Sequence, residues 1–516
     1  MSEGDKLSTL TGEIQNLSVE DPTLHIGELL VRQAGKEEFG ECDVPKAVTF
    51  TSLPIDESLK SAIKKKGFST MSKIQQIGLP LFLSNPPAHL IAQAQAGTGK
   101  TATFVLGSLA RMNKELLSAD LKTRINKPQV IILAVTQELV TQIAVTVNEF
   151  GQDMGIHARR VMSDINKSVD GGRGRGRGRG SGALNRGNVI TAEWSLAAGQ
   201  DFQEQVIVGT VGKVKQYLDN FIQNRKPYID PSEVRSLILD EADQMLGDTR
   251  LAPEVFEIRD ALPRIKTREC QLGLFSATYA ENVKAIAQKF VFNDKKMYHE
   301  ILLSRKDLTL DKVDNFFIVI GNDQDEERTV YNKKCQAVLD VWKSLSDVNI
   351  VGQSIVFVKL KETCNDVTDF LRREGIDAGQ IHGDMDKIER DRVFQEFKEG
   401  KRANLVATNA LSRGIDNQDV KLVINLDLPE LPNGNADPET FVHRIGRSSR
   451  WTKRGASVSL VSANPNSRDK SLLAEIERIL FAEVNRPLIQ VPEPLKVGPF
   501  LKERLDKLES AKQANQ

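Results

Sequence analysis

Short apolar runs rich in β-branched residues alternate along the chain with longer stretches in which apolar residues recur at helical spacing. Such runs are typical of strands buried on both faces, and the amphipathic stretches between them are typical of helical crossovers. The first half of the chain therefore predicts a parallel sheet flanked by helices. Its expected strands are His89–Ala94, Val130–Val135, Glu204–Thr210, Val234–Asp240 and Leu272–Thr278.

The alternation pauses over a charged segment near residues 293–312 and then resumes. A pause of this kind between two similar patterns predicts two α/β domains joined by a flexible linker. The strands expected in the second domain are Asn315–Ile320, Ser354–Val358, Ala403–Thr408, Lys421–Leu426 and Ala456–Val461.

The composition of the flanking segments completes the predicted organisation. Residues 1–46 are too polar to form a core and are expected to be a flexible leader. We place the first domain at residues 47–296, the linker at 297–312 and the second domain at 313–485, with a helix at Ser471–Phe481. The charged residues 486–516 are expected to form a loosely held tail.

An insertion of alternating glycine and arginine, Gly171–Gly182, interrupts the first domain. Alternate glycines raise the entropic cost of order, so neither helix nor strand is expected there. Two interpretations remain open: a disordered surface loop, or an arm whose guanidinium groups follow RNA phosphates and stack on bases.

Composition narrows the class of protein. A chain of 516 residues with 40% hydrophobic residues can fill more than one core. Lys plus Arg and Asp plus Glu both number 70, so any binding to nucleic acid must be local. The cysteines at 42, 270, 335 and 364 lack disulfide or metal spacing and predict free thiols in a reducing compartment. Neither a signal peptide nor a membrane insertion is expected.

The segment Ala94–Thr101, AQAGTGKT, carries the first candidate chemistry. It lies between an expected strand and an expected helix, the context of a phosphate-binding loop, although Ala94 replaces the first glycine of the general pattern. Backbone N–H groups around Gly97 and Gly99 would face the phosphates of ATP. Lys100 would reach the β- and γ-phosphates, and the Thr101 hydroxyl would hold Mg²⁺.

A run of carboxylates, Asp240-Glu241-Ala242-Asp243, follows the expected strand at Val234–Asp240. A carboxylate at the end of a buried strand beside a phosphate-binding loop is placed to bind Mg²⁺, and we expect Asp240 to do so. Glu241 would polarise the water that attacks the γ-phosphate.

Together, AQAGTGKT, LDEAD, FSAT and HRIGRSSR resemble the motifs of the DEAD-box family of ATP-dependent RNA helicases, over residues 50–461. The resemblance implies two RecA-like domains that close on ATP and single-stranded RNA. It implies that Gln75 binds the adenine edge and Phe68 its ring, with Phe50 as the upstream aromatic, and that Ser276 and Thr278 couple the nucleotide site to strand separation. The ATP-binding residues implied around the phosphates are Ala96, Gly97, Thr98, Gly99, Lys100 and Thr101.

The resemblance also implies that residues of the second domain contact the nucleotide and the RNA. Gly414 would approach phosphate, Asp416 would meet the ribose, and Arg447 and Arg450 would reach the γ-phosphate as arginine fingers from one face of a helix. The RNA contacts implied are Thr136, Gly212, Arg390 and Thr408.

Several positions depart from the family pattern. Gln137 replaces an arginine, Val211 a proline and Lys213 an arginine in the RNA motifs. Met71, Ser448 and Ser449 are further departures. Since the phosphate and Mg²⁺ ligands are intact, we expect a working ATPase with an altered grip on RNA, for which the Arg-Gly insertion would compensate.

Two longer stretches, Pro227–Met245 and Asp427–Arg447, resemble the nuclear-pore mRNA-export branch of the family. That resemblance implies a monomer that remodels messenger ribonucleoprotein in the cytoplasm and nucleus, at the cytoplasmic face of the pore. It also implies an export-factor activator with inositol hexakisphosphate and a nucleoporin as partners. Two other functions stay open: an RNA clamp with slow hydrolysis, and a DNA translocase, which the family's contacts to 2′-hydroxyls disfavour.

Overall fold

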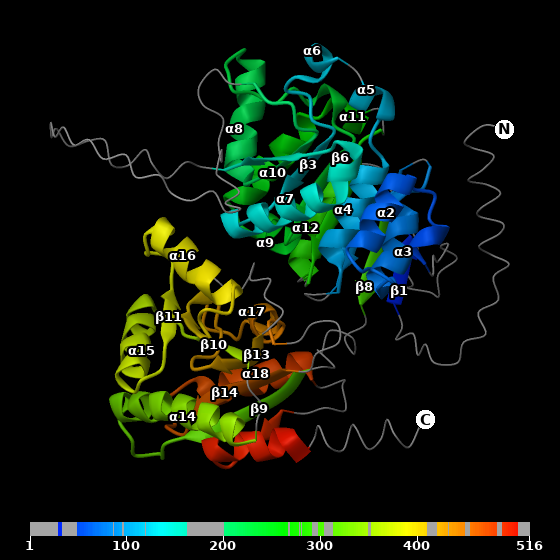
Figure 1. Cartoon of the computed structure of the whole chain (residues 1–516). Helices are drawn as coiled ribbons and strands as arrows, with labels where there is room; N and C mark the ends of the chain where they lie inside the picture. The colour runs from blue at the N-terminus through cyan, green and yellow to red at the C-terminus, as the bar shows by residue number, and fades with distance from the viewer. Residues whose placement is uncertain are drawn as a thin grey trace, which may run out of the picture. The chain divides into compact units, whose positions relative to one another are not determined.

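The computed structural model divides the chain into two compact units, one built mainly from residues 31–93 and 99–301 and the other from residues 302–516 (Figure 1). The structure describes residues 29–33 (backbone only), 49–85, 87–94, 98–118, 120–162, 201–266, 269–277, 279, 281–291, 298–303, 313–348, 352–409, 420–431, 433–448, 455–481 and 488–503. The leader up to residue 28, the Arg-Gly insertion and most of the predicted linker lie outside these residues.

The first unit is a sheet of eight strands in the order β1-β8-β2-β7-β6-β3-β5-β4. Pairing is parallel from β8 through β4. The strands are β1 Leu29–Gln33, β2 His89–Gln93, β3 Val130–Leu133, β4 Ala158–Val161, β5 Val206–Gly209, β6 Ser236–Asp240, β7 Gln271–Ser276 and β8 Tyr298–Leu303. The helices are α2 Glu57–Lys65, α3 Lys73–Phe82, α4 Lys100–Ala110, α5 Lys114–Ser118, α6 Leu121–Arg124, α7 Gln137–Gly151, α8 Val211–Ile222, α9 Ala242–Gly247, α10 Leu251–Asp260, α11 Pro263–Lys266 and α12 Glu281–Val291.

The second unit is a parallel sheet of seven strands in the order β11-β12-β10-β13-β14-β9-β15. The strands are β9 Val313–Ile320, β10 Gln353–Phe357, β11 Ala378–Ile381, β12 Asn404–Ala407, β13 Val420–Asn425, β14 Gly455–Ser462 and β15 Ile489–Gln490. The helices are α14 Glu327–Asp347, α15 Lys361–Arg373, α16 Lys387–Lys398, α17 Pro438–Ile445 and α18 Asp469–Leu480.

The two sheets share one topology. Read from the other edge, the second order is β15-β9-β14-β13-β10-β12-β11, which repeats β8-β2-β7-β6-β3-β5-β4 strand for strand in chain order. The prediction of two parallel sheets with helical crossovers is therefore confirmed, and all ten expected strands are present.

Burial on both faces explains why the central strands read as continuous apolar runs. In β10, Ile355 and Phe357 join one hydrophobic cluster while Val356 joins another, and all three are fully buried. Neighbouring side chains of a strand point to opposite faces, so both faces of the sheet are covered.

The structure corrects three predicted boundaries. Strand β8 pairs with β2 in the first sheet, so the first unit extends past residue 296 into the expected linker. Strand β1 lies inside the expected flexible leader. In the expected loose tail, β15 pairs with β9, and Val491, Val497 and Leu501 are buried in the second unit's core.

Two further expectations concern cysteines and membranes. Cys270, Cys335 and Cys364 are free, buried thiols, as predicted, and burial raises the pKa of each thiol. Within the part of the chain that the structure describes, no helix is both long and apolar enough to cross a membrane.

Candidate nucleotide and RNA site

The candidate residues of the first unit follow the carboxyl ends of its parallel strands. Lys100 follows β2, Thr136 follows β3, Gly212 follows β5, Asp240 ends β6 and Ser276 ends β7. In the sheet these strands are neighbours in the order β2-β7-β6-β3-β5. Ligands of open parallel sheets bind at this edge, so the expected ATP residues and the expected RNA residues occupy adjoining parts of it.

The phosphate-binding loop leads into α4. Gly99 caps this helix with a left-handed backbone, φ 98°, and Lys100 is the first helical residue. Lys100 is buried, with 7% of its surface exposed, and Thr101 is half-buried. A helix N-terminus preceded by a glycine turn presents N–H groups to an anion. Ala96 and Gly97 lie outside the described residues.

The carboxylates at the end of β6 lie close together in sequence and are buried from solvent. Asp240, Glu241 and Asp243 are all buried, and Asp240 Oδ1 accepts a hydrogen bond from the Glu241 N–H at 3.2 Å. Burial raises the pKa of the Asp240 carboxyl, the Glu241 carboxylate raises it further, and the Lys100 ammonium opposes the rise. This edge therefore favours a bound cation.

The residues fit a magnesium ion that is shared with a nucleotide. Among the described residues, no group of three or more His, Cys, Asp or Glu side chains forms a metal cage. Mg²⁺ commonly takes one or two protein ligands and the rest from substrate phosphates and water, so Asp240 with the Thr101 hydroxyl is an adequate set.

Ser276 at the end of β7 joins this cluster. Its Oγ donates a 2.6 Å hydrogen bond to Asp243 Oδ1, and both groups are buried. The bond ties the Ser-Ala-Thr segment to α9, as its expected coupling role requires. Thr278, the other expected coupling residue, lies outside the described residues.

Gln75 lies against the phosphate-binding loop. Its Oε1 accepts a hydrogen bond from the Ser72 N–H at 2.9 Å, which caps α3. Its Nε2 is buried and has no hydrogen-bond partner among the described residues. A Cβ at Gly99 would lie 2.6 Å from this Nε2. The amide therefore offers a spare donor beside the loop, which fits an adenine-edge contact.

We expect Gly99→Ala to weaken nucleotide binding at least about tenfold, because the new methyl group both strains a left-handed backbone and displaces Gln75. Binding of a fluorescent ATP analogue measures this. Gly155→Ala is the matched control, since its φ is 68° but nothing lies within 4 Å of the added Cβ. Equal affinity in the two variants would contradict the proposed contact.

Two aromatic residues expected near adenine form a cluster with a third. The Phe68 ring meets Phe50 edge-on at 6.3 Å between centroids and Phe150 at 5.8 Å. Phe50 is buried and Phe68 is half-buried. The cluster anchors the segment before α3 and so supports the position of Gln75.

Three of the four expected RNA residues closely follow the ends of strands, and the fourth, Arg390, lies on a helix. Thr136 caps α7, with its Oγ1 accepting from the Leu139 N–H at 3.2 Å, and Gly212 is exposed in the first turn of α8. Thr408 follows β12, and its N–H donates to the Ile381 carbonyl at 3.1 Å. Arg390 lies on α16, after β11.

The finger motif is arranged differently from the prediction. Helix α17 ends at Ile445, so Arg447 lies in the turn that follows and not on a helical face. Arg447 is buried, and its Nε donates to the His443 carbonyl at 3.2 Å. Arg450, Gly414 and Asp416 lie outside the described residues.

Sequence reasoning missed Arg444, which is fully buried in the second unit. Its guanidinium donates to Asn409 Oδ1, to Asn425 Oδ1 at 3.0 Å and to the Asp427 carbonyl at 2.6 Å. It also covers the Phe357 ring at 5.0 Å. Burial lowers its pKa to about 10. Arg444 thus fixes α17, and with it the turn that carries Arg447.

We expect Arg444→Lys to lower the free energy of unfolding of the second unit by about 2–4 kcal/mol, because one ammonium cannot replace a planar group with three partners. Urea denaturation followed by tryptophan fluorescence tests this. The control is Arg478→Lys on the exposed side of α18. Equal stability of the two variants would contradict the structural role of Arg444.

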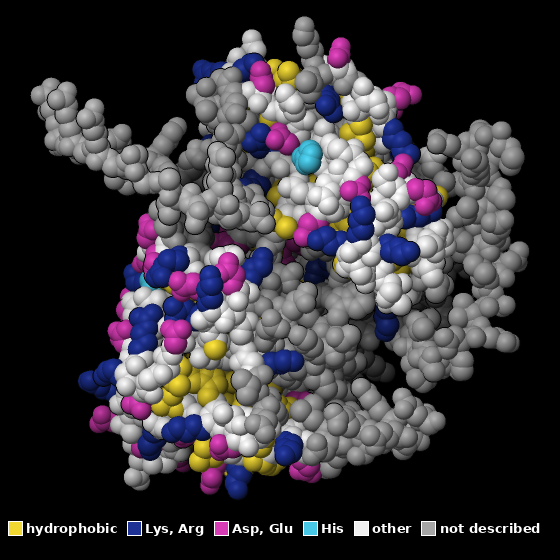
Figure 2. Space-filling view, viewed as in Figure 1, with side chains coloured by type: hydrophobic (Ala, Val, Ile, Leu, Met, Phe, Trp, Pro, Cys, Tyr) yellow, Lys and Arg dark blue, Asp and Glu magenta, His cyan; other side chains and the backbone are white. Residues whose placement is uncertain are grey.

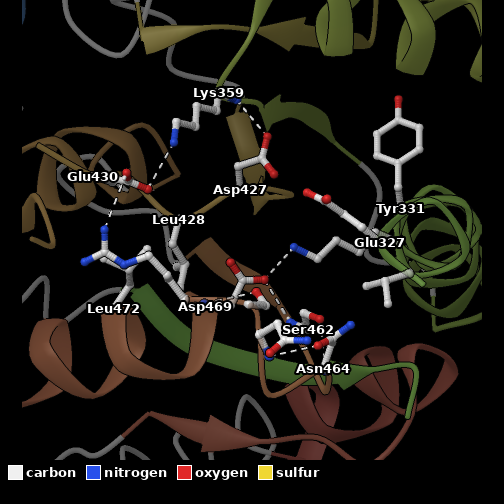
Figure 3. A pocket seen from close by; sticks show the side chains of 15 residues that line it. Glu327, Tyr331, Lys359, Asp427, Leu428, Glu430, Ser462, Asn464, Asp469 and Leu472 are labelled. Carbon is white, nitrogen blue, oxygen red and sulfur yellow. Dashed lines mark hydrogen bonds and ion pairs between the residues drawn. The ribbon is translucent and has the colours of Figure 1, made fainter. Parts of the chain in front are cut away.

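The corresponding edge of the second sheet has a pocket of about 410 Å³ beyond β10, β13 and β14 (Figure 3). Its lining charges bind one another: Lys334 Nζ donates to Asp469 at 2.8 Å, and Lys359 Nζ to Glu430 at 3.1 Å. Glu327 and Asp427 add two more carboxylates. With Arg468, three basic side chains face four carboxylates, so this pocket lacks the excess of positive charge that would favour a triphosphate.

Charge on the surface follows the balanced composition. On the face drawn in Figure 2, basic and acidic side chains are interspersed over both units. In the described part of the chain, this face therefore carries no broad basic surface that would attract RNA electrostatically, which agrees with the expectation that contacts to RNA are local.

Comparisons with known protein families agree with the site. Residues 72–286 match the DEAD/DEAH box helicase domain, and residues 333–452 match the helicase conserved C-terminal domain. The chain is 33% identical over 415 residues to the ATP-dependent RNA helicase DBP5 of Saccharomyces cerevisiae, covering 80% of this chain and 73% of the relative. It is 30% identical to the DBP5 of Mycosarcoma maydis, covering 89% and 86%.

Solved structures give the same result. The chain resembles S. cerevisiae Dbp5 bound to RNA and ADP BeF3, with a TM-score of 0.70, 30% identity, and coverage of 89% of this chain and 99% of that one. A Dbp5 variant bound to gle1 and ip6 matches with a TM-score of 0.67, 31% identity, and coverage of 89% and 99%. The nucleotide edge, the two sheets of one topology and these relatives together show that the chain belongs to the DEAD-box family and is an ATP-dependent RNA helicase.

Proposed function

We propose that this helicase couples ATP hydrolysis to the remodelling of RNA and its bound proteins through closure of its two units. The observation that carries the proposal is the buried group formed by Lys100, Asp240 and Glu241 at one sheet edge. Lys100 would bind the β- and γ-phosphates together with N–H groups from Ala96 to Thr101. Glu241 would hold the attacking water.

Magnesium would be held by Asp240 and Thr101, and it would supply charge neutralisation at the β- and γ-phosphates. Gln75 and Phe68 would select adenine. From the second unit, Gly414 and Asp416 would contact the nucleotide, and Arg447 and Arg450 would stabilise the charge that develops during hydrolysis. Hydrolysis would then require closure, because these groups come from different units.

The RNA chain would run over Thr136 and Gly212 in the first unit and over Arg390 and Thr408 in the second. Gln137, Val211 and Lys213 depart from the family pattern, so the proposed grip is weaker in the first unit. The arginines of the Gly171–Gly182 insertion would compensate. Ser276 and Thr278 would transmit the state of the nucleotide.

The cellular setting proposed is mRNA export. The similar Dbp5 structures contain RNA, gle1 with ip6, and nup159. By this similarity, the helicase would act as a monomer on messenger ribonucleoprotein, with an export-factor activator, inositol hexakisphosphate and a nucleoporin as partners. It would work in the cytoplasm and nucleus, at the cytoplasmic face of the nuclear pore.

The testing experiment is steady-state phosphate release by the full chain with ATP alone, with single-stranded RNA and with single-stranded DNA. RNA is expected to stimulate release, DNA is not, and GTP is expected to be a poor substrate. Equal stimulation by DNA would favour a translocase on DNA. Tight ATP-dependent RNA binding without stimulated release would favour the clamp.

A further inference from the structure

Tyr279 carries an unexplained hydroxyl close to the nucleotide edge. Its Oη is buried and has no hydrogen-bond partner among the described residues. The side chain packs, partly buried, against the hydrophobic core of the first unit. A buried donor without a partner costs free energy that a phenylalanine would not cost, so such groups are few in native proteins.

The carboxylates of the site act electrostatically on this hydroxyl. Burial is the main cause that raises the pKa of Tyr279 well above its ordinary value, and Asp243, Glu241, Asp240 and then Glu300 raise it further. The hydroxyl therefore keeps its proton and remains a hydrogen-bond donor. Asp243 is the carboxylate that acts on it most strongly, and it already accepts one bond from Ser276.

The backbone next to Tyr279 is tied to the same edge. Gln93 at the end of β2 donates from Nε2 to the Ala277 carbonyl at 3.3 Å. Ser276 binds Asp243 of α9. Tyr279 thus follows a segment that connects the strand before the phosphate-binding loop with the helix after the carboxylates.

We propose that Tyr279 is a positioning residue, whose hydroxyl donates a hydrogen bond to Asp243 when ATP and RNA are bound and thereby orients the turn that carries Glu241. The inference rests on the proposed function. A carboxylate accepts several hydrogen bonds, so Asp243 can take this second donor without losing Ser276. Because this bond would orient Glu241 for the attack on the γ-phosphate, its loss would slow the chemical step and leave the binding of ATP unchanged.

The test is Tyr279→Phe in the full chain, with two measurements. In urea denaturation without nucleotide, the variant is expected to be at least as stable as the wild type, because it loses a hydroxyl that has no partner. In phosphate release with saturating single-stranded RNA, kcat is expected to fall about tenfold while KM for ATP is unchanged.

The matched control is Tyr331→Phe, which removes a buried phenol hydroxyl from a tyrosine that lines the pocket of the second unit (Figure 3). This control is expected to leave RNA-stimulated kcat unchanged. Unchanged kcat in Tyr279→Phe would overturn the inference, and so would a marked loss of stability, since that would mean a hydroxyl already bonded at rest. Absent RNA stimulation in the wild type would instead overturn the proposed function, and the inference with it.

Discussion

Lys100→Ala is expected to lower RNA-stimulated ATP hydrolysis by on the order of 10³ or more, because it removes the buried cation that would bind the β- and γ-phosphates. The structure adds a second effect. The Lys100 ammonium opposes the rise in the pKa of Asp240, so its loss leaves Asp240 and Glu241 crowded without a compensating charge. The Asp240 carboxyl is then more readily protonated, which weakens it as a metal ligand.

Phosphate release at saturating ATP and RNA measures this effect, with nucleotide affinity as a second measurement. Lys64→Ala is the control, because Lys64 is an exposed lysine on α2 of the same unit. Its loss changes the net charge equally without touching the edge. Turnover of the Lys100 variant within a few-fold of the Lys64 variant would remove Lys100 from the phosphate site.

The strands that the sequence predicted are those with neighbours on both sides and helices on both faces. The missed strands lie mostly at the edges of the sheets: β4 carries Arg159 and Arg160, β11 is short and contains Gly379, and β15 has two residues. An edge strand has one open side and does not need a continuous apolar run, so the pattern that identifies central strands fails there.

Strand β8 was missed for a different reason. Glu300 lies at its centre and is fully buried, with Gln288 Nε2 donating to its Oε1 at 2.6 Å and Lys284 4.0 Å from its Oε2. A charged residue within YHEILL breaks the apolar pattern, and only the tertiary partners make its burial acceptable. The predicted linker consequently began too early.

The residues of the candidate site were predictable where a charged or hydroxyl side chain directly follows an apolar run of the sequence. Lys100, Asp240, Glu241 and Ser276 follow the ends of apolar runs, so the parallel-sheet prediction already brought them to one edge. Arg444 and Tyr279 were not predictable, because burial of a guanidinium or a phenol depends on residues distant in sequence. The Ser-Ala-Thr motif identifies Ser276 at the end of β7, whereas no motif in the sequence marks Tyr279.

Arg447→Ala is expected to lower RNA-stimulated turnover by on the order of 10³, with nucleotide affinity of the first unit changed only a few-fold. The reason is that the two sets of groups belong to different units: Lys100 and the carboxylates at 240–243 belong to one, and Arg447 belongs to the other. Arg447 would thus act on the charge of the transition state and contribute little to ground-state binding of ATP. Single-turnover hydrolysis and equilibrium nucleotide binding measure the two quantities separately.

Two further variants separate chemistry from folding. Arg447→Lys keeps a positive charge but loses the planar fork, so it is expected to recover only part of the rate. Arg444→Lys, three residues earlier, is expected to lose stability, whereas Arg447→Ala is expected to keep a cooperative unfolding transition. An RNA clamp has no need of a group that stabilises the transition state. The RNA clamp and the enzyme therefore give their most different predictions at this residue. If Arg447→Ala hydrolyses ATP at the wild-type rate and still binds RNA in an ATP-dependent way, the clamp is supported. The same result would exclude Arg447 as an arginine finger.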